Sequence, residues 1–202
     1  MAGRKNRNAE LRIPEILEAY YRVLIDEGLE GTSISKIAKS IDIHPSLILH
    51  YFQNKDNLRA ALIELIVSKF KSRHLINFDH IEDDQERFDA LMDMIFSYEW
   101  SRTVDPGVHF GFYYQSFRDE HVHKLFTDMF VWFRDFLHDQ FVDFNRKGVI
   151  QVSDEVKAAD FVLTMMEGLE FHAHFLAGDN PFEDFAQSCK KTAYTILKNR
   201  GV

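Results

Sequence analysis

The chain has 202 residues, of which 46% are hydrophobic and 28% are charged, and its formal net charge is −8. This balance provides enough apolar side chains for a buried core and argues against an intrinsically disordered protein. The single cysteine, Cys189, excludes an internal disulfide framework and a cysteine-based zinc cluster. The sequence has no signal-peptide pattern and no apolar run near the roughly 18 residues of a membrane span, so we expect a cytoplasmic protein.

The charge is divided unevenly along the chain. Residues 1–73 carry 12 Lys or Arg and 9 Asp or Glu, whereas residues 74–202 carry 12 and 23. Four of the basic residues lie within the segment Arg4–Arg12. This division favours a small head that tolerates a polyanion and a larger acidic body that does not. An ordinary solvated basic tail is the alternative interpretation.

The first predicted helix has apolar residues at offsets of three and four from Ile13 to Leu24, and we expect Gly28 and Gly31 to end it. The hydroxyl pair Thr32–Ser33 follows and can cap a second, two-turn helix. The inner face of this second helix contains Ile34, Ile37, Ala38 and Ile41.

A turn over residues 42–44 separates the second helix from a third. Pro45 suits the first position of this third helix, which we place at residues 45–52. Its periodicity turns Ile48 and Phe52 inward and leaves Ser46, Leu49 and His50 outward. Asn54 can cap a fourth helix, which we expect to link head and body over residues 55–77.

The rest of the chain is predicted to be helical throughout. We expect helices at about 84–101, 106–118, 121–147, 154–177 and 182–199. Glycine and proline mark the breaks, near residues 105–107, 147–148 and 178–181. Only 9 glycines and 4 prolines are present, and no period-two alternation appears, so the sequence predicts an all-α fold.

Two short helices joined by a three-residue turn and supported by a longer helix form a helix-turn-helix, whose second helix fits a major groove about 12 Å wide. The surrounding residues make this signal more specific. They are the Gly-x3-Thr-Ser opening at Gly28, the Ile-Ala pair at Ile37, and the Tyr-Phe-x-Asn-Lys-x-x-Leu run at 51–58. With these features the chain resembles the TetR family of transcriptional repressors.

The resemblance implies a DNA-binding domain at residues 1–54, the linking helix at 55–77, and an effector-binding and dimerisation domain at 78–202. It further implies a homodimer that represses transcription by binding a palindromic operator in double-stranded DNA. A small molecule entering the C-terminal bundle would release the operator. The same fold acting without a small effector, under the control of a protein partner, is the alternative.

The DNA-contacting residues follow partly from chemistry and partly from the resemblance. Ser33 at a helix N-terminus makes an anion site that suits a phosphate, and Ser35 and Lys36 lie outward on the same helix. The resemblance adds Lys55 as a phosphate ligand and the third helix as the element that reads base edges. The full set is Ser33, Ser35, Lys36, Pro45, Ser46, Leu47, Leu49, His50, Tyr51 and Lys55.

Two residues depart from the family pattern. Asp42 stands where the family usually has glycine in the turn, and a left-handed conformation is less easily adopted by aspartate. Leu49 replaces the usual tyrosine and removes a hydroxyl, although it can meet a thymine methyl group. We therefore expect affinity to depend on phosphate contacts and on a basic arm, Arg4–Arg12, in the minor groove.

The central helices are rich in aromatic residues, most of which we expect in the ordinary core. Some are predicted to line a pocket for an apolar or aromatic effector. The candidates are Phe96, Trp100, Phe110, Tyr113, Tyr114, Phe117, Phe133, Met165, Leu169 and His172. A hydrogen-bonding group on the effector could meet Tyr113, Gln115 or His172. The glutamates Glu99, Glu167 and Glu170 would favour a cation but fit surface or interface positions better.

The last two helices are predicted to form the dimer through their apolar faces. The interface candidates are Phe161, Val162, Met166, Ala173, Phe185, Cys189, Ala193 and Ile196. We expect no metal site, because the pairs His121–His123 and His172–His174 diverge on a helix, and Glu170 with His174 supplies only two ligands. No cofactor motif appears.

An enzyme is disfavoured, because the sequence has no nucleophile–base order and no glycine-rich phosphate loop. Effector, target genes and operator sequence are not encoded in a readable way. Activation in place of repression also stays open, since the sign of regulation depends on where the operator lies.

Overall fold

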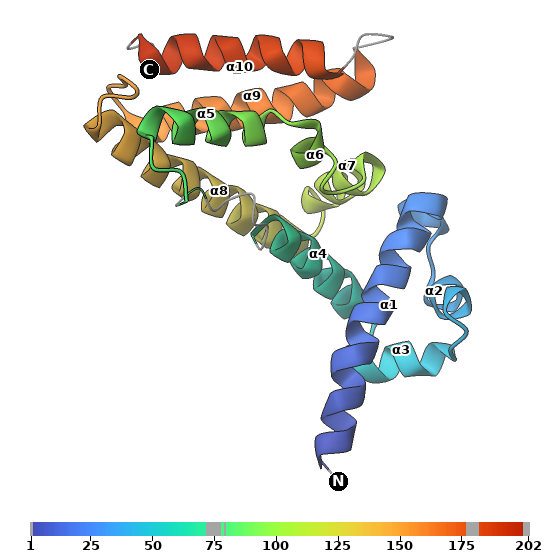
Figure 1. Ribbon diagram of the computed structural model, residues 1–202. Helices are drawn as coiled ribbons and strands as arrows, with labels where there is room; N and C mark the ends of the chain where they lie inside the picture. Colours follow the sequence, from blue (N-terminus) through green and yellow to red (C-terminus); the bar gives the residue numbers. More distant parts are fainter. Residues whose placement is uncertain (1, 72–77, 79, 177–181, 200–202) are drawn as a thin grey trace. The chain divides into compact units, whose positions relative to one another are not determined.

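The computed structural model (Figure 1) describes residues 2–71, 78, 80–176 and 182–199, and the side chains of residues 2–9, 70 and 71 lie outside this description. Over the described residues the elements are all α-helices, which confirms the predicted all-α fold. They are α1 (Ala2–Gly31), α2 (Ile34–Ser40), α3 (Pro45–Phe52), α4 (Lys55–Lys71), α5 (Asp84–Ile95), α6 (Tyr98–Ser101), α7 (Pro106–Ser116), α8 (Glu120–Arg146), α9 (Glu155–Phe175) and α10 (Phe182–Lys198).

The end of α1 follows the predicted glycine signal. Gly28 has φ 68° and ψ 179°, a conformation that is essentially restricted to glycine, and it kinks the helix there. The Thr32 hydroxyl donates a 2.7 Å hydrogen bond to the Gly28 carbonyl and is itself buried. The described part of the predicted linking helix ends at Lys71, and residues 72–77 of that prediction lie outside the described residues.

The helix predicted at 84–101 is two helices, which corrects that boundary. α5 ends at Ile95, and α6 begins after Ser97, whose backbone is extended with φ −84° and ψ 152°. The Ser97 hydroxyl accepts a 3.0 Å hydrogen bond from the Trp100 N–H and caps α6. A serine that caps a new helix competes with continuation of the old one, and here the cap prevails.

The described residues pack into two compact units. The first contains residues 1–72 and 104–127, so α7 and the start of α8 pack with the head. The Tyr21 hydroxyl accepts a 2.7 Å hydrogen bond from the Asp105 N–H at the start of α7. Leu29 lies directly against Gly111, where an added Cβ would come within 2.8 Å of its Cδ1. The core of this unit includes Ile16, Leu17, Tyr20, Leu24, Ile37, Ile48, Phe52, Leu58 and Leu62.

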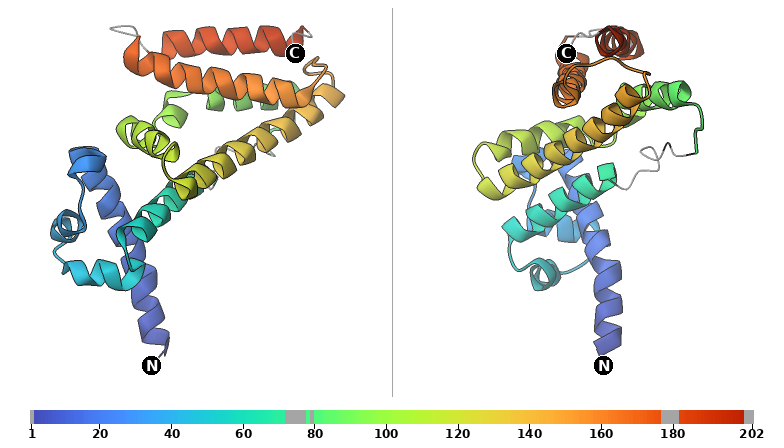
Figure 2. Two further views of the ribbon diagram at one scale, coloured as in Figure 1. Left: turned by 180° about the vertical axis from the view of Figure 1, so that it is seen from behind. Right: turned by 90° about the vertical axis from the view of Figure 1, so that its left-hand side faces the viewer.

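The second unit contains residues 73–103 and 128–202. Within it α10 runs antiparallel beside α9 (Figures 1 and 2). Its core includes Phe88, Leu91, Leu137, Phe141, Phe144, Ala159, Val162 and Leu197. No helix among the described residues has the length and apolar character needed to span a membrane.

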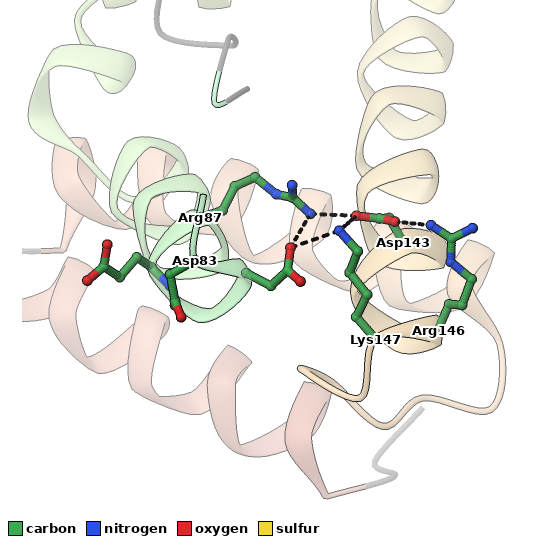
Figure 3. A network of polar contacts seen from close by, with 7 residues as sticks. Asp83, Arg87, Asp143, Arg146 and Lys147 are labelled. Carbon is green, nitrogen blue, oxygen red and sulfur yellow. Dashed lines mark hydrogen bonds and ion pairs between the residues drawn. The ribbon is translucent and has the colours of Figure 1, made fainter. Parts of the chain in front are cut away.

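A network of ion pairs joins α5 to the end of α8 (Figure 3). Arg87 lies 2.9 Å from Asp84 and 2.5 Å from Asp143, and Lys147 bridges the same two carboxylates at 2.8 and 3.0 Å. Desolvation alone would raise the pKa of Asp143, but hydrogen bonds from Lys147 and Arg146 outweigh it and lower that pKa. The network therefore links the two helices through ion pairs in which the charged form of Asp143 is favoured.

Candidate nucleic-acid interface

α2 and α3 form the helix-turn-helix expected from the sequence. Ile37 and Ala38 hold α2 in the core, and Ile48 and Phe52 do the same for α3. Asp42 adopts the left-handed conformation, with φ 52°, so the chain makes the turn without the usual glycine. The Ile43 N–H then donates to the Ala38 carbonyl at 3.0 Å and closes the turn.

The N-terminus of α2 is organised by Ser33 and Lys55. The Ser33 hydroxyl accepts a 3.2 Å hydrogen bond from the Lys36 N–H, which confirms the predicted cap. The Lys55 ammonium lies 3.3 Å from the Thr32 carbonyl oxygen, which places this cation beside the start of α2. Asn54 caps α4 through a 2.8 Å bond from the Asn57 N–H, as the sequence predicted.

Lys36 is engaged by a partner that the sequence reading did not anticipate. Its ammonium forms an ion pair with the Glu27 carboxylate of α1. The two side chains are 46% and 43% exposed, so solvent weakens the pair. Glu27 therefore competes with any phosphate for Lys36. Sequence spacing could not predict this ion pair, because its two residues lie on different helices.

The outer face of α3 carries the side chains that the sequence assigned to base edges. Ser46, Leu49 and His50 are exposed, as predicted, while Pro45 is at the first helical position. The remaining reading candidates, Leu47 and Tyr51, are half-buried, and the exposed Ser35 and Lys36 lie on α2. Leu49 is 42% exposed, which leaves its apolar side chain open to a partner.

His44 caps α3, a role that the sequence did not predict. Its Nδ1 accepts a 3.3 Å hydrogen bond from the Ser46 N–H and lies 2.7 Å from the Ser46 hydroxyl. A histidine directly before a proline at a helix start was the available signal. It was missed because serine, threonine, aspartate and asparagine are the usual caps.

The basic arm is described only in part. α1 begins at Ala2, but the side chains of Arg4, Lys5 and Arg7 lie outside the described residues. Arg12 pairs with Glu15 at 2.6 Å. The predicted contact of this segment with the minor groove stays a prediction.

The predicted effector-pocket residues fall into the two packing units. In the second unit Trp100 stacks on Phe133 with ring centroids 5.2 Å apart, and its indole N–H donates to the Met166 sulfur at 3.1 Å. Phe96 and Leu169 are buried in this unit, and Met165 and His172 are half-buried there. In the first unit Phe110 is half-buried, whereas Tyr113, Tyr114 and Phe117 are exposed.

Two of the three groups expected to hydrogen-bond an effector are buried without a partner. These are the Gln115 amide oxygen and the His172 Nδ1. The imidazole of His172 also stacks on Phe185, with ring centroids 3.7 Å apart and an interplanar angle of 12°. A buried polar atom without a partner costs about 1–3 kcal/mol, so each of these atoms favours a bound polar group.

The predicted dimer residues differ widely in exposure. Val162, Met166 and Ala193 are buried within a single chain, and Phe161, Ala173, Cys189 and Ile196 are half-buried. Phe185 is exposed. Phe171, Phe175 and Leu176, which the sequence reading did not include, are the most exposed apolar side chains at the end of α9, at 53%, 64% and 67%.

Glu170 does not offer an unpaired carboxylate. Arg102 lies 3.3 Å from it, and His174 lies 4.0 Å from it. Across the described residues no group of three His, Cys, Asp or Glu side chains is arranged to hold a metal ion.

The sequence matches two family models. Residues 83–199 match the tetracyclin repressor-like C-terminal domain, and residues 16–62 match the bacterial regulatory proteins of the tetR family. The exposed face of α3 and these two matches define a helix-turn-helix DNA-binding regulator of transcription. The chain belongs to the TetR family.

Curated relatives match parts of the chain. The BetI regulator of Rhizobium meliloti (strain 1021) is 26% identical over 115 residues, and the PksA regulator of Bacillus subtilis (strain 168) is 35% identical over 69 residues. The chain spans 57% of BetI and 34% of PksA, and the matches cover the same shares of this chain.

Solved structures match nearly the whole chain and share its fold. A TetR regulator from Haloarcula marismortui superimposes with a TM-score of 0.80 at 20% identity, covering 93% of this chain and 97% of that one. A regulator from Saccharomonospora viridis in complex with choline gives 0.78 at 18% identity, covering 94% and 97%. AibR in complex with isovaleryl coenzyme A and operator DNA gives 0.66 at 23% identity, covering 90% and 97%.

Proposed function

We propose that this regulator is a repressor that binds a palindromic operator as a homodimer and leaves it when a small apolar or aromatic effector binds. The observation that carries the proposal is the geometry of α3. Ile48 and Phe52 fix the helix in the head, and Ser46, Leu49 and His50 are exposed together on it. The AibR structure, solved with operator DNA, supports this use of the fold.

On this proposal, specificity and affinity come from different residues. Ser46 and His50 reach base edges, and Leu49 meets a thymine methyl group. Lys55 and Ser33, which lie together at the start of α2, hold a backbone phosphate. Because few strong hydrogen-bonding groups are available on α3, phosphate contacts supply most of the affinity.

Selection of bound duplexes from a random pool, repeated over a series of salt concentrations, tests the DNA-binding part. We expect a palindrome and a steep negative slope of log affinity against log salt concentration. The substitution Lys55→Ala should reduce that slope by about one, because one phosphate contact is lost. Lys157→Ala, which removes an exposed lysine of α9, is the matched control and should leave the slope unchanged. Failure to enrich any duplex at low salt would refute the proposal.

The effector is proposed to bind in the body and to satisfy a buried polar group. Within the second packing unit the His172 Nδ1 is buried without a partner, Trp100 stacks on Phe133, and the rings of Trp132 and Phe136 lie against Phe133. The regulators solved with choline and with isovaleryl coenzyme A show that this fold accommodates small molecules of different charge. Here Glu170 is already paired with Arg102, which favours an uncharged effector over a cation.

A thermal-shift screen of apolar and aromatic metabolites tests the effector. A ligand at 100 times its Kd should stabilise the protein by about 2.7 kcal/mol. Addition of the same ligand should also release the selected operator. A ligand that raises the melting temperature without releasing DNA would contradict the proposed regulation by an effector.

The homodimer is proposed to form through the exposed faces of α9 and α10. The rings of Phe171 and Phe175 lie 4.8 Å apart at the end of α9, Leu176 is exposed beside them in the chain, and Phe185 is exposed on α10. Exposed apolar clusters of this kind mark interaction surfaces. The predicted dimer residues that are buried within one chain, Val162, Met166 and Ala193, then pack under this surface and do not contact the second copy directly.

A further inference from the structure

The start of α3 contains a pair of polar side chains whose hydrogen bonds have a defined direction. His44 caps the helix, and its Nδ1 lies 2.7 Å from the Ser46 hydroxyl oxygen and 3.3 Å from the Ser46 backbone nitrogen. Both residues are exposed, and Pro45 between them fixes the backbone. The pair therefore lies on the surface that the regulator presents to DNA.

The backbone bond determines the tautomer of the imidazole. A backbone N–H can only donate, so His44 Nδ1 must be the acceptor, and the ring proton sits on Nε2. The Ser46 hydroxyl, which is the closer neighbour of Nδ1, must then donate its hydrogen to it. Once this hydrogen is used, the Ser46 oxygen has only lone pairs to offer to another molecule.

We propose that His44 is a positioning residue that fixes the Ser46 hydroxyl as a hydrogen-bond acceptor, so that Ser46 selects an exocyclic amino group in the major groove. This proposal rests on the proposed reading of base edges by α3. In the major groove the amino groups are N6 of adenine and N4 of cytosine. An oriented Ser46 accepts from one of them and has no hydrogen for guanine O6 or N7, for thymine O4 or for a phosphate.

The orientation of the Ser46 hydroxyl matters for discrimination between base pairs. An unoriented serine hydroxyl rotates freely and serves equally well as donor or acceptor. Every base pair presents both kinds of group in the major groove, so a freely rotating hydroxyl discriminates poorly. The orientation imposed by His44 turns a weak contact into one that distinguishes the two directions of a base pair.

The experiment uses the full chain and the duplex obtained by the selection described above. The variant Ser46→Ala first locates the base pair that Ser46 contacts. This is the position at which the variant, unlike the unmodified protein, binds duplexes with different base pairs equally well. At that position the amino group is removed by placing purine for adenine or 2-pyrimidinone for cytosine. In separate duplexes a purine N7 is replaced by C–H. Binding is measured by competition in fluorescence anisotropy.

Removal of the amino group should weaken binding of the unmodified protein by about three- to tenfold, the effect of one hydrogen bond. The same change should cost Ser46→Ala and His44→Ala less than about twofold, because neither variant holds an oriented acceptor. His44→Asn should restore discrimination, since its amide oxygen can cap α3 and accept from Ser46. Ser68→Ala, in an exposed position on α4, is the matched control and should behave as the unmodified protein.

The outcomes separate this proposal from the wider one. If no duplex is selected, the proposed function fails. If a duplex is selected and Ser46→Ala changes discrimination at no position, the proposed function stands and this inference is overturned. It is also overturned if N7 removal is costly while amino removal is not, since Ser46 then donates. Finally, a His44→Ala variant that weakens all duplexes equally would show that His44 is only a helix cap.

Discussion

Replacement of Asp119 by alanine should destabilise the first packing unit by a measurable amount. Asp119 accepts hydrogen bonds from the N–H groups of His121 and Val122, at 3.0 and 3.1 Å, and so caps the start of α8. It also forms an ion pair with Arg59 of α4. The side chains of Arg59 and Asp119 are 19% and 29% exposed, so the pair is partly shielded from solvent.

The expected magnitude has two parts. Loss of an N-cap costs about 1 kcal/mol, and loss of a partly shielded ion pair costs about 1 kcal/mol more. Asp119→Ala should therefore lower the free energy of unfolding by roughly 2 kcal/mol and the melting temperature by roughly 4–8 °C. Asp119→Asn keeps a capping oxygen and loses only the charge, so it should lose about half as much.

Urea and thermal unfolding of these variants, each followed by circular dichroism, are the assays. Asp56→Asn is the matched control, because Asp56 contacts the same Arg59 at 3.1 Å but is 79% exposed. It should cost less than about 0.5 kcal/mol. The double variant Arg59→Ala/Asp119→Ala should show a coupling energy of about 1 kcal/mol. A change below about 0.5 kcal/mol in Asp119→Ala, or equal losses in the alanine and asparagine variants, would refute the reasoning.

The same pair predicts a dependence on pH. Hydrogen bonds from the Val122 backbone, together with the charge of Arg59, hold the pKa of Asp119 below its ordinary value despite partial desolvation. A lowered folded-state pKa contributes stability that is present above the unfolded pKa of about 3.9 and is lost as pH falls through the folded value. The difference between the unmodified protein and Asp119→Asn should therefore be constant near neutrality and shrink below about pH 4. A difference that grows with acidity would contradict the assignment.

Three further predictions follow from other contacts. Glu27→Gln frees Lys36 from its ion pair and should raise operator affinity about two- to fivefold at low salt, as measured by fluorescence anisotropy. Glu30→Gln, which changes an exposed neighbouring residue, should change the affinity less. Gly28→Ala should cost about 1–3 kcal/mol in urea unfolding, because φ 68° with ψ 179° strains a residue with a Cβ although no atom lies within 4 Å of that Cβ. Phe175→Glu places a charge on the proposed dimer surface and should shift the protein towards monomer in analytical ultracentrifugation. The helical circular dichroism signal should stay intact. An unchanged mass would exclude this surface from the interface.

The helix-turn-helix could be predicted from the sequence because its signals are local. A glycine at 28, a hydroxyl at 33, a proline at 45 and an amide at 54 each act on backbone within four residues. The inward side of α3 was also predicted correctly, since Ile48 and Phe52 lie four residues apart and both are buried. Local chemistry therefore located the helix-turn-helix, and the family resemblance assigned its second helix to the DNA interface.

The exposure of the body helices was not readable in the same way. α9 is apolar on most of its surface, so periodicity could not separate Val162, which is buried in one chain, from Phe175, which is exposed. Which side of such a helix is covered depends on the neighbouring helices, and these come from distant parts of the sequence.

Contacts between distant residues likewise required the tertiary structure. The ion pair of Arg59 with Asp119 joins positions 60 residues apart, and Glu27 reaches Lys36 from another helix. Sequence spacing indicates which residues share a helical face, but it does not specify how two helices pack. The sequence by itself thus determined the all-α fold, the helix-turn-helix and the caps at Ser33 and Asn54. Only the packing of helices decided which charges pair and which apolar faces stay open.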